Sequence, residues 1–404
     1  MTAKSNNAYD GVAKKRWPVI VDGVRTPFLN SGGAYSEFYD HELAALPLKS
    51  ILEKTGVAAK QVELVTMGMV VQDVETTNVA REAMLTAGYP SSIPAYTISM
   101  AGVSPAMGVM NVCDMIALGR VDIAVAGGSE NFSDLPIRMA RNVRKRAVKL
   151  ATAKSSTQKL KILAGLRPKD LIPEPPSGID LTTQMNMGNA CEAMVRRFGV
   201  SREQADAYAA RSHQMAGAAW QAGRYNEEVI PVTNPKGQRV ERDDSMRPDT
   251  SEAKLAKLTP SFDKQNGIIT AGNASGLTDG AAALLLMSAE AAKQQNLNPL
   301  ATVRDYQITG VVDMHTEMLL GPAMSIPRLL ARNGLSMDDI SVFELHEAFA
   351  AQILANQHAL SDDTFAQNEL GLSKATGPIP IEKLNLWGGS VALGNPFAAT
   401  GGRI

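Results

Sequence analysis

The chain has 404 residues and a formal net charge of -1 at pH 7; 45% of its residues are hydrophobic and 20% are charged. This length predicts two or more lobes, and the composition is that of an ordinary soluble globular protein. A neutral chain has no overall positive field, so we expect no nucleic-acid partner. Only two cysteines occur, Cys113 and Cys191, which excludes a disulfide scaffold and a cysteine metal cluster and favours a reducing compartment.

The N-terminal segment, residues 1–15, is polar. It lacks the apolar core of a secretory signal and the arginine-rich pattern of a transit peptide. No apolar run approaches the roughly 18 residues that a membrane span needs. We therefore expect a soluble protein in the cytoplasm.

Strand and helix patterns alternate in the first third of the chain. Short apolar runs predict strands at residues 17–21, 64–71, 95–99 and 123–126. Apolar residues at helical spacing predict helices at residues 41–54, 78–87 and 105–118. Such alternation implies a largely parallel sheet that is covered by helices on both faces.

The pattern changes after Asp134, where basic residues gather with few acids. They are Arg138, Arg141, Arg144, Lys145, Arg146, Lys149, Lys154, Lys159 and Lys161. This basic cluster is either a solvated helical face or a docking surface for the phosphates of a nucleotide-like ligand or for a partner protein. Ser201 and Gln204 form a capping-box pattern that opens a helix to about Ala222. We expect residues 134–267 to be an inserted, mostly helical domain.

The alternation resumes after the insertion. It predicts strands at residues 268–271, 281–287, 301–308 and 341–345 and a helix at 325–333. Residues 268–290 would then complete an N-terminal lobe that begins with residues 1–133. Residues 291–404 would form a C-terminal lobe.

Three motifs carry a family resemblance. They are Ile-Ile-Thr-Ala-Gly-Asn-Ala-Ser-Gly-Leu-Thr-Asp-Gly at 268–280, Glu-Leu-His-Glu-Ala-Phe at 344–349 and Gly-Gly-Ser-Val-Ala-Leu-Gly-Asn-Pro at 388–396. Together they resemble the thiolase family, which handles acyl groups on coenzyme A, from about residue 18 to the end. The resemblance implies an α/β fold of two stacked βα lobes, layered helix, sheet, helix, sheet, helix, with an inserted helical loop domain.

The thiolase nucleophile is a cysteine at a strand-to-helix junction, where the helix dipole lowers the thiol pKa. By resemblance, Gly102 holds that position in this chain. Glycine can donate its backbone N–H to an oxyanion but cannot form a thioester. Cys113 lies about 16 Å further along a helix, too far to substitute, and fits a packing role. Cys191 fits either a core position or one near the ligand.

The other catalytic positions are also taken from the resemblance. His346 matches the histidine that stabilises an oxyanion, while Glu347 would support the loop. Asn395 stands where the family's Gly-His-Pro places the general base, and asparagine cannot act as a base. The family pattern continues with a helix, a strand and a Cys-x-Gly loop, which we expect the C-terminal lobe of this chain to lack.

The side of the site that binds coenzyme A matches the family at five residues. The resemblance assigns pantetheine contacts to Ser275, Ala271, Met187, Met318 and Phe349. Each of the three large apolar residues would equally fit a core. We expect no metal and no cofactor, since the coenzyme A thioester is itself the substrate or ligand.

The resemblance implies an acetyl-CoA C-acyltransferase of fatty-acid β-oxidation, with covalent thiolysis impaired by the loss of the nucleophile. The insertion is most similar to that of long-chain 3-ketoacyl-CoA thiolase subunits. We therefore expect a homodimer or dimer of dimers and either a hydratase/dehydrogenase partner subunit or a small partner subunit. Two alternatives remain: retro-aldol cleavage of a 3-hydroxyacyl-CoA, and a non-catalytic subunit paired with an active paralogue.

Overall fold

The computed structural model describes residues 7–72 and 74–404, so the first six residues of the polar N-terminal segment lie outside it. The chain divides into two compact units. The main body comprises residues 7–70, 78–134 and 179–404, and the loop unit comprises residues 71–77 and 135–178. The boundaries differ from the predicted insertion of 134–267, because residues 179–267 belong to the main body.

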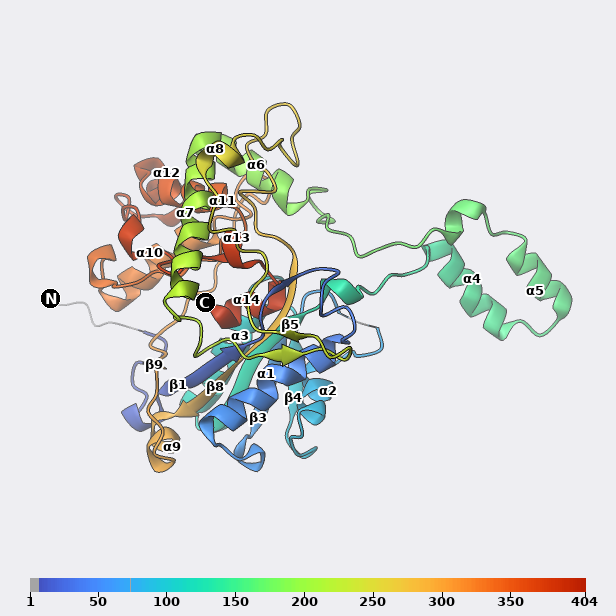
Figure 1. Ribbon diagram of the computed structural model, residues 1–404, viewed down its shortest axis with the longest axis horizontal. Helices are drawn as coiled ribbons and strands as arrows, with labels where there is room; N and C mark the ends of the chain where they lie inside the picture. Colours follow the sequence, from blue (N-terminus) through green and yellow to red (C-terminus); the bar gives the residue numbers. More distant parts are fainter. Residues whose placement is uncertain (1–6, 73) are drawn as a thin grey trace. The chain divides into compact units, whose positions relative to one another are not determined.

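A seven-stranded sheet forms the centre of the main body (Figure 1). Its strand order is β4-β3-β5-β8-β1-β9, and β2 pairs with β8. The strands are β1 Pro18–Arg25, β2 Leu29–Asn30, β3 Leu64–Gly68, β4 Ala95–Ile98, β5 Ile123–Glu130, β8 Thr278–Ser288 and β9 Ala301–Thr302. A separate hairpin pairs β6, Val232–Thr233, with β7, Arg239–Val240.

The sheet is mixed, whereas the sequence predicted a largely parallel one. Strands β3, β4 and β5 run parallel, but β8 is antiparallel to both β5 and β1. The long β8 returns to the sheet after the excursion of residues 131–277. It inserts between β5 and β1, so the sheet is completed from a distant part of the chain.

Alternating side chains of β5 face two different helical layers. Ile123 and Val125 pack with α1, Asp40–Thr55, and α2, Val79–Thr86. Ala124 and Ala126 pack with α3, Ser104–Ala117. Both faces of the sheet are therefore covered, and every residue of β5 is buried.

The C-terminal half is mainly helical. Its helices are α9 Ala289–Gln294, α10 Gly321–Asn333, α11 Ala350–Leu360, α12 Asp363–Leu370, α13 Ser390–Leu393 and α14 Phe397–Arg403. Helices α10 to α13 share a core with α6, Met187–Phe198, and α7, Arg202–Gln221, whereas α9 and α14 bury residues against the first lobe. A short helix, α8, spans Glu252–Leu255. This shared core is why residues 179–267 do not form a separate domain.

Three predicted strands are short or missing. The strand predicted at residues 301–308 is reduced to the short β9, and residues 268–271 are irregular. The segment 341–345 makes one parallel bridge, from Phe343 to Leu384. The bridge is parallel, like the pairing of β3 with β4. In the described residues, however, the bridged segments have no further paired strand, whereas β3 also pairs with β5. Two short paired segments alone are marginal in water.

The loop unit contains α4, Arg141–Thr152, and α5, Ser156–Leu163. No residue of either helix is buried. The two helices are linked by a hydrogen bond from the Arg146 guanidinium to the Ile162 carbonyl, 2.6 Å. Most of the basic cluster therefore lies on solvated helices, and Arg138 and Lys154 lie outside them. No helix among the described residues combines the length and the apolar character needed to cross a membrane.

The approach of α14 to the sheet gives a test of the packing. A Cβ on Gly128 of β5 would lie 1.7 Å from the Ala398 carbonyl oxygen, whereas a Cβ on Gly102 would meet no atom within 4 Å. Gly128→Ala should therefore lower the free energy of unfolding by about 3 kcal/mol or more. Gly102→Ala is the matched control and should change it little. Urea denaturation measures both, and equal stabilities would contradict the packing.

Candidate functional site

The strand-to-helix junction after β4 is sharply bent. Ala101 has a φ of 48°, in the left-handed region that costs a non-glycine residue about 1 kcal/mol. The Ser104 hydroxyl holds this turn, since it accepts from Met100 N at 2.7 Å and donates to the Ala101 carbonyl. Gly102 follows at an exposed position with free space around it. The junction has room for a side chain that the sequence does not supply.

The Asn-Ala-Ser-Gly and His-Glu-Ala-Phe motifs are directly joined. An antiparallel bridge pairs Ala274 with Phe349. The backbone N–H and the hydroxyl of Ser275 both donate to the Ala348 carbonyl, at 2.9 and 3.1 Å. Ala350 N in turn donates to Asn273 O at 2.9 Å. Two motifs that are about 70 residues apart thus form one rigid wall.

Asn395 connects the third motif to this wall. Its backbone N–H donates to Gly276 O at 2.9 Å. Its side-chain oxygen accepts from the Thr400 hydroxyl at 2.7 Å and is buried. At the residue after Thr400, a Cβ on Gly401 would lie 3.0 Å from the Pro105 ring at the start of α3. Helix α14 therefore links Asn395 to the junction that carries Gly102.

His346 is a neutral, partly buried imidazole. Burial, together with the nearby positive charge of Arg403, lowers its pKa from 6.5 to about 4. Its Nδ1 lies 2.9 Å from the Ser390 hydroxyl at the start of α13. At neutral pH this ring can donate one hydrogen bond, but it carries no positive charge.

Glu347 is fully buried and belongs to the scaffold. Its carboxylate accepts four hydrogen bonds, from Tyr208 OH at 3.0 Å, Ser212 Oγ at 2.7 Å, Asn385 Nδ2 at 2.6 Å and Val391 N at 3.2 Å. These donors come from α7, from the segment before α13 and from α13 itself. The supporting role predicted for Glu347 matches this geometry.

The five residues that resemble pantetheine contacts are not all in one place. Met187 begins α6 and is 38% exposed, and Phe349 is buried and packs edge-on against Phe262 with ring centroids 6.1 Å apart. The Phe262 ring also lies against Gly188, so it connects Phe349 to the start of α6. Ala271 is exposed, while Met318 is half-buried on the segment before α10.

Sequence reasoning missed three residues here, Phe262, Ser390 and Arg403. Phe262 is an isolated aromatic residue in a loop without a periodic pattern, and Ser390 is one serine among many. Arg403 follows the Asn-Pro motif and acts on His346 at a distance. Only the third motif, which contains Ser390, offered a signal that could have found any of them.

Neither cysteine is a usable nucleophile. Cys113 lies on the buried face of α3, and burial raises the pKa of its thiol to about 12. Cys191 lies in the core shared by α6 and α11, and burial raises its pKa well above the ordinary value. Both therefore remain protonated thiols at neutral pH.

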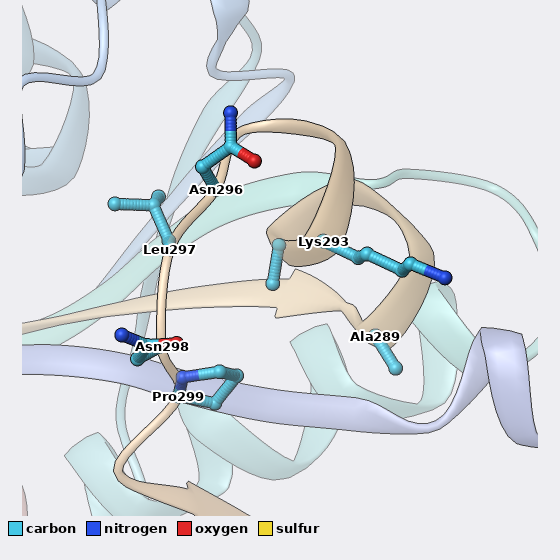
Figure 2. Close-up of a pocket in the computed structure, with 7 residues that line it drawn as sticks. Ala289, Lys293, Asn296, Leu297, Asn298 and Pro299 are labelled. Atoms are coloured by element: carbon cyan, nitrogen blue, oxygen red, sulfur yellow. The ribbon is translucent and has the colours of Figure 1, made fainter.

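Two cavities are lined by none of the residues that the sequence predicted for the site, although Arg403 lines the second. The first, about 350 Å³, lies beside α9 and is lined by Ala289, Ala292, Lys293, Asn296, Leu297, Asn298 and Pro299 (Figure 2). The second, about 550 Å³, is lined by β1, the end of α7, Trp387 and Arg403. Neither contains a predicted site residue, so the candidate site is defined by the joined motifs.

Comparison with known proteins decides the family. A model of the thiolase N-terminal domain matches residues 18–290, and a model of the thiolase C-terminal domain matches residues 297–404. This chain belongs to the thiolase family. The mitochondrial trifunctional enzyme subunit beta of Bos taurus is 43% identical over 96% of this chain and 81% of its own length. A 3-ketoacyl-CoA thiolase of Yersinia pestis is 40% identical over 96% of this chain and 88% of its own length.

Solved thiolase structures confirm the predicted thiolase-like α/β fold. The human mitochondrial 3-ketoacyl-CoA thiolase superposes with a TM-score of 0.80 at 31% identity, covering 97% of this chain and 91% of that one. An acetyl-CoA acetyltransferase of Bacillus anthracis also gives 0.80, at 32% identity, covering 96% and 90%. The thiolase fold is thus kept around a junction that bears glycine.

The Glu347 carboxylate should dominate the stability of the thiolase site. Glu347→Ala leaves four buried donors without an acceptor, so the free energy of unfolding should fall by about 3 kcal/mol or more. Glu382→Ala, an exposed residue of the same half, should change it by less than about 0.5 kcal/mol. Urea denaturation at pH 7 compares them. A mild effect of Glu347→Ala would mean that water replaces the lost acceptor.

His346 should make stability depend on pH. Because the pKa of its imidazole is about 4 in the folded chain and has its ordinary value of 6.5 after unfolding, the unfolded chain binds the proton first as pH falls through 6.5. This contribution to stability is therefore present above pH 6.5 and is lost towards pH 4. His346→Gln should reduce the loss between pH 7 and pH 5 by up to about 2 kcal/mol. Denaturation at both pH values checks it; an unchanged difference would contradict a neutral His346.

Proposed function

We propose that this chain is an acyl-CoA-binding protein of the thiolase family, of fatty-acid β-oxidation type, that is impaired in covalent thiolysis. The proposal rests on Gly102. It stands at the bent junction before α3, where thiolase chemistry requires a thiolate, and it has no side chain to acylate. Loss of a nucleophile from a catalytic unit lowers rates by a factor on the order of 10⁶.

No other group in the described residues replaces the missing thiolate. Both cysteines are buried and protonated, and Asn395 cannot serve as a general base. The side-chain oxygen of Asn395 is already occupied by the Thr400 hydroxyl. The covalent half of acetyl-CoA C-acyltransferase chemistry therefore has neither its nucleophile nor its base.

The capacity to bind a thioester is better supported. A relative of the same fold, human mitochondrial 3-ketoacyl-CoA thiolase, has been solved in complex with CoA, with a TM-score of 0.79 to this chain. The wall formed by the Ser275 and Ala348 segments is intact, and its small residues let an extended ligand lie close to the backbone. Gly102 N–H and the His346 ring are the donors available to a thioester oxygen.

Two surfaces of the chain support binding to partner proteins. Strand β4 is an edge of the sheet in the described residues, and an edge strand can pair with a second copy in a homodimer. The relatives include a subunit of a trifunctional enzyme, so a hydratase/dehydrogenase subunit is a second partner. The basic loop unit has exposed apolar side chains at Ile137, Val148 and Leu160 and is a suitable docking element.

Gain of acylation in a variant tests the proposal. The wild type should bind acetoacetyl-CoA and free coenzyme A without forming a protein adduct. Gly102→Cys has room for its side chain and should gain one acyl group, more completely when combined with Asn395→His. Gly102→Ala is the matched control and should gain none. Calorimetry measures binding, and intact-protein mass spectrometry measures the adduct.

Three outcomes would contradict the proposal. An acyl adduct on Cys113 or Cys191 of the wild type would show that another nucleophile works. Turnover of a 3-hydroxyacyl-CoA without an adduct would establish retro-aldol chemistry instead. Absence of binding to every coenzyme A ligand would favour a non-catalytic subunit that pairs with an active paralogue.

A further inference from the structure

Ser390 occupies a position that the structure fixes tightly. It is the first residue of α13, and the backbone N–H groups on both sides of it are held: Gly389 N donates to Ser212 Oγ at 3.1 Å and Val391 N to Glu347 at 3.2 Å. A Cβ on Gly389 would lie 2.3 Å from Glu347 Cδ, so this approach requires glycine. The Ser390 hydroxyl is thus presented to His346 by an anchored backbone.

The hydrogen bond between Ser390 and His346 has two possible directions. Either the hydroxyl donates to Nδ1, or Nδ1–H donates to the hydroxyl. Within residues 7–72 and 74–404, His346 is the hydrogen-bond partner of the Ser390 hydroxyl, and Ser390 is fully buried. If Nδ1 carried the proton, the hydroxyl hydrogen would be left buried without an acceptor, which costs about 1–3 kcal/mol. The Ser390 hydroxyl is therefore favoured as the donor, because its hydrogen then has Nδ1 of His346 as an acceptor.

We propose that Ser390 is a positioning residue that holds His346 in the tautomer with its proton on Nε2. The neutral imidazole then has Nδ1 as acceptor and Nε2–H as its single donor. Since the described residues place no hydrogen-bond partner on Nε2, that N–H is free for a ligand oxygen. This inference rests on the proposed function only for the ligand, a thioester carbonyl. The tautomer itself is a property of the free protein.

Nitrogen-15 spectra of the full-length chain with labelled histidine test the tautomer. The chain has five histidines, so His346→Gln assigns the signals of residue 346 by difference. At pH 7 the wild type should show a protonated Nε2 and an unprotonated Nδ1. Ser390→Ala should give a mixture of tautomers, and Ser390→Thr, which keeps the hydroxyl, should restore the single form.

Ser129→Ala is the matched control for this spectrum. Ser129 is an equally buried serine on β5, but its hydroxyl donates to Asp40 at 3.0 Å and makes no hydrogen bond to His346 within the described part of the chain. The His346 signals should keep the wild-type tautomer in this variant. A wild-type proton on Nδ1, or a tautomer unchanged in Ser390→Ala, would overturn the proposal.

Ligand affinity separates this inference from the proposed function. Ser390→Ala should weaken acetoacetyl-CoA about five-fold, the effect of one lost neutral hydrogen bond, and leave free coenzyme A unchanged because it has no thioester carbonyl. Equal weakening of both ligands would overturn the assigned role of Nε2–H. If neither ligand binds, the proposed function fails, and the spectra still decide the tautomer.

Discussion

The buried carboxylate of Glu347 is the constraint on which the rest of the site depends. An isolated carboxylate cannot be buried without cost, so it must be surrounded by donors. Here α7 supplies Tyr208 and Ser212, and α13 supplies a backbone N–H. The carboxylate thereby joins helices that are far apart in the sequence, and it explains why α7 belongs to the main body.

His346 precedes this carboxylate directly, so its backbone position is fixed by the same network. Burial keeps the imidazole neutral, and Arg403 adds to the effect because two like charges would lie near each other. The site can therefore offer oriented hydrogen-bond donors with little positive charge. Donors of this kind stabilise a polarised carbonyl oxygen, but they do not move a proton away from carbon.

The sequence located strands and helices of the first lobe, because hydrophobic periodicity determines which residues of β5, α1 and α3 are buried, but it did not predict the antiparallel direction of β8. The sequence-based prediction failed in segments whose conformation is determined by tertiary contacts. Residues 268–271 read as a strand, yet the N–H groups of Ile268 and Ile269 donate to the side chain of Glu192 on α6 rather than to a neighbouring strand. Nothing in the local pattern of either segment reveals that contact.

The same limit applies to the site. The three motifs could be located from the sequence, but the residues that orient them could not be assigned. Ser212 and Phe262 lie outside the motifs, and Ser390 is an ordinary residue type within the third one. Helical periodicity also could not separate residues 135–178 from α6 and α7. The difference is burial: α6 and α7 bury an apolar face, whereas α4 and α5 bury no residue.

The junction at Gly102 combines a costly backbone with an absent side chain. Left-handed Ala101 persists because Ser104 bonds both flanking backbone groups, so the bend is maintained without any help from residue 102. The exposed Gly102 keeps its backbone N–H, which the proposed function assigns to recognition of a thioester oxygen. In that proposal, binding of the substrate is separated from the bond-making step that thiolase chemistry adds to it.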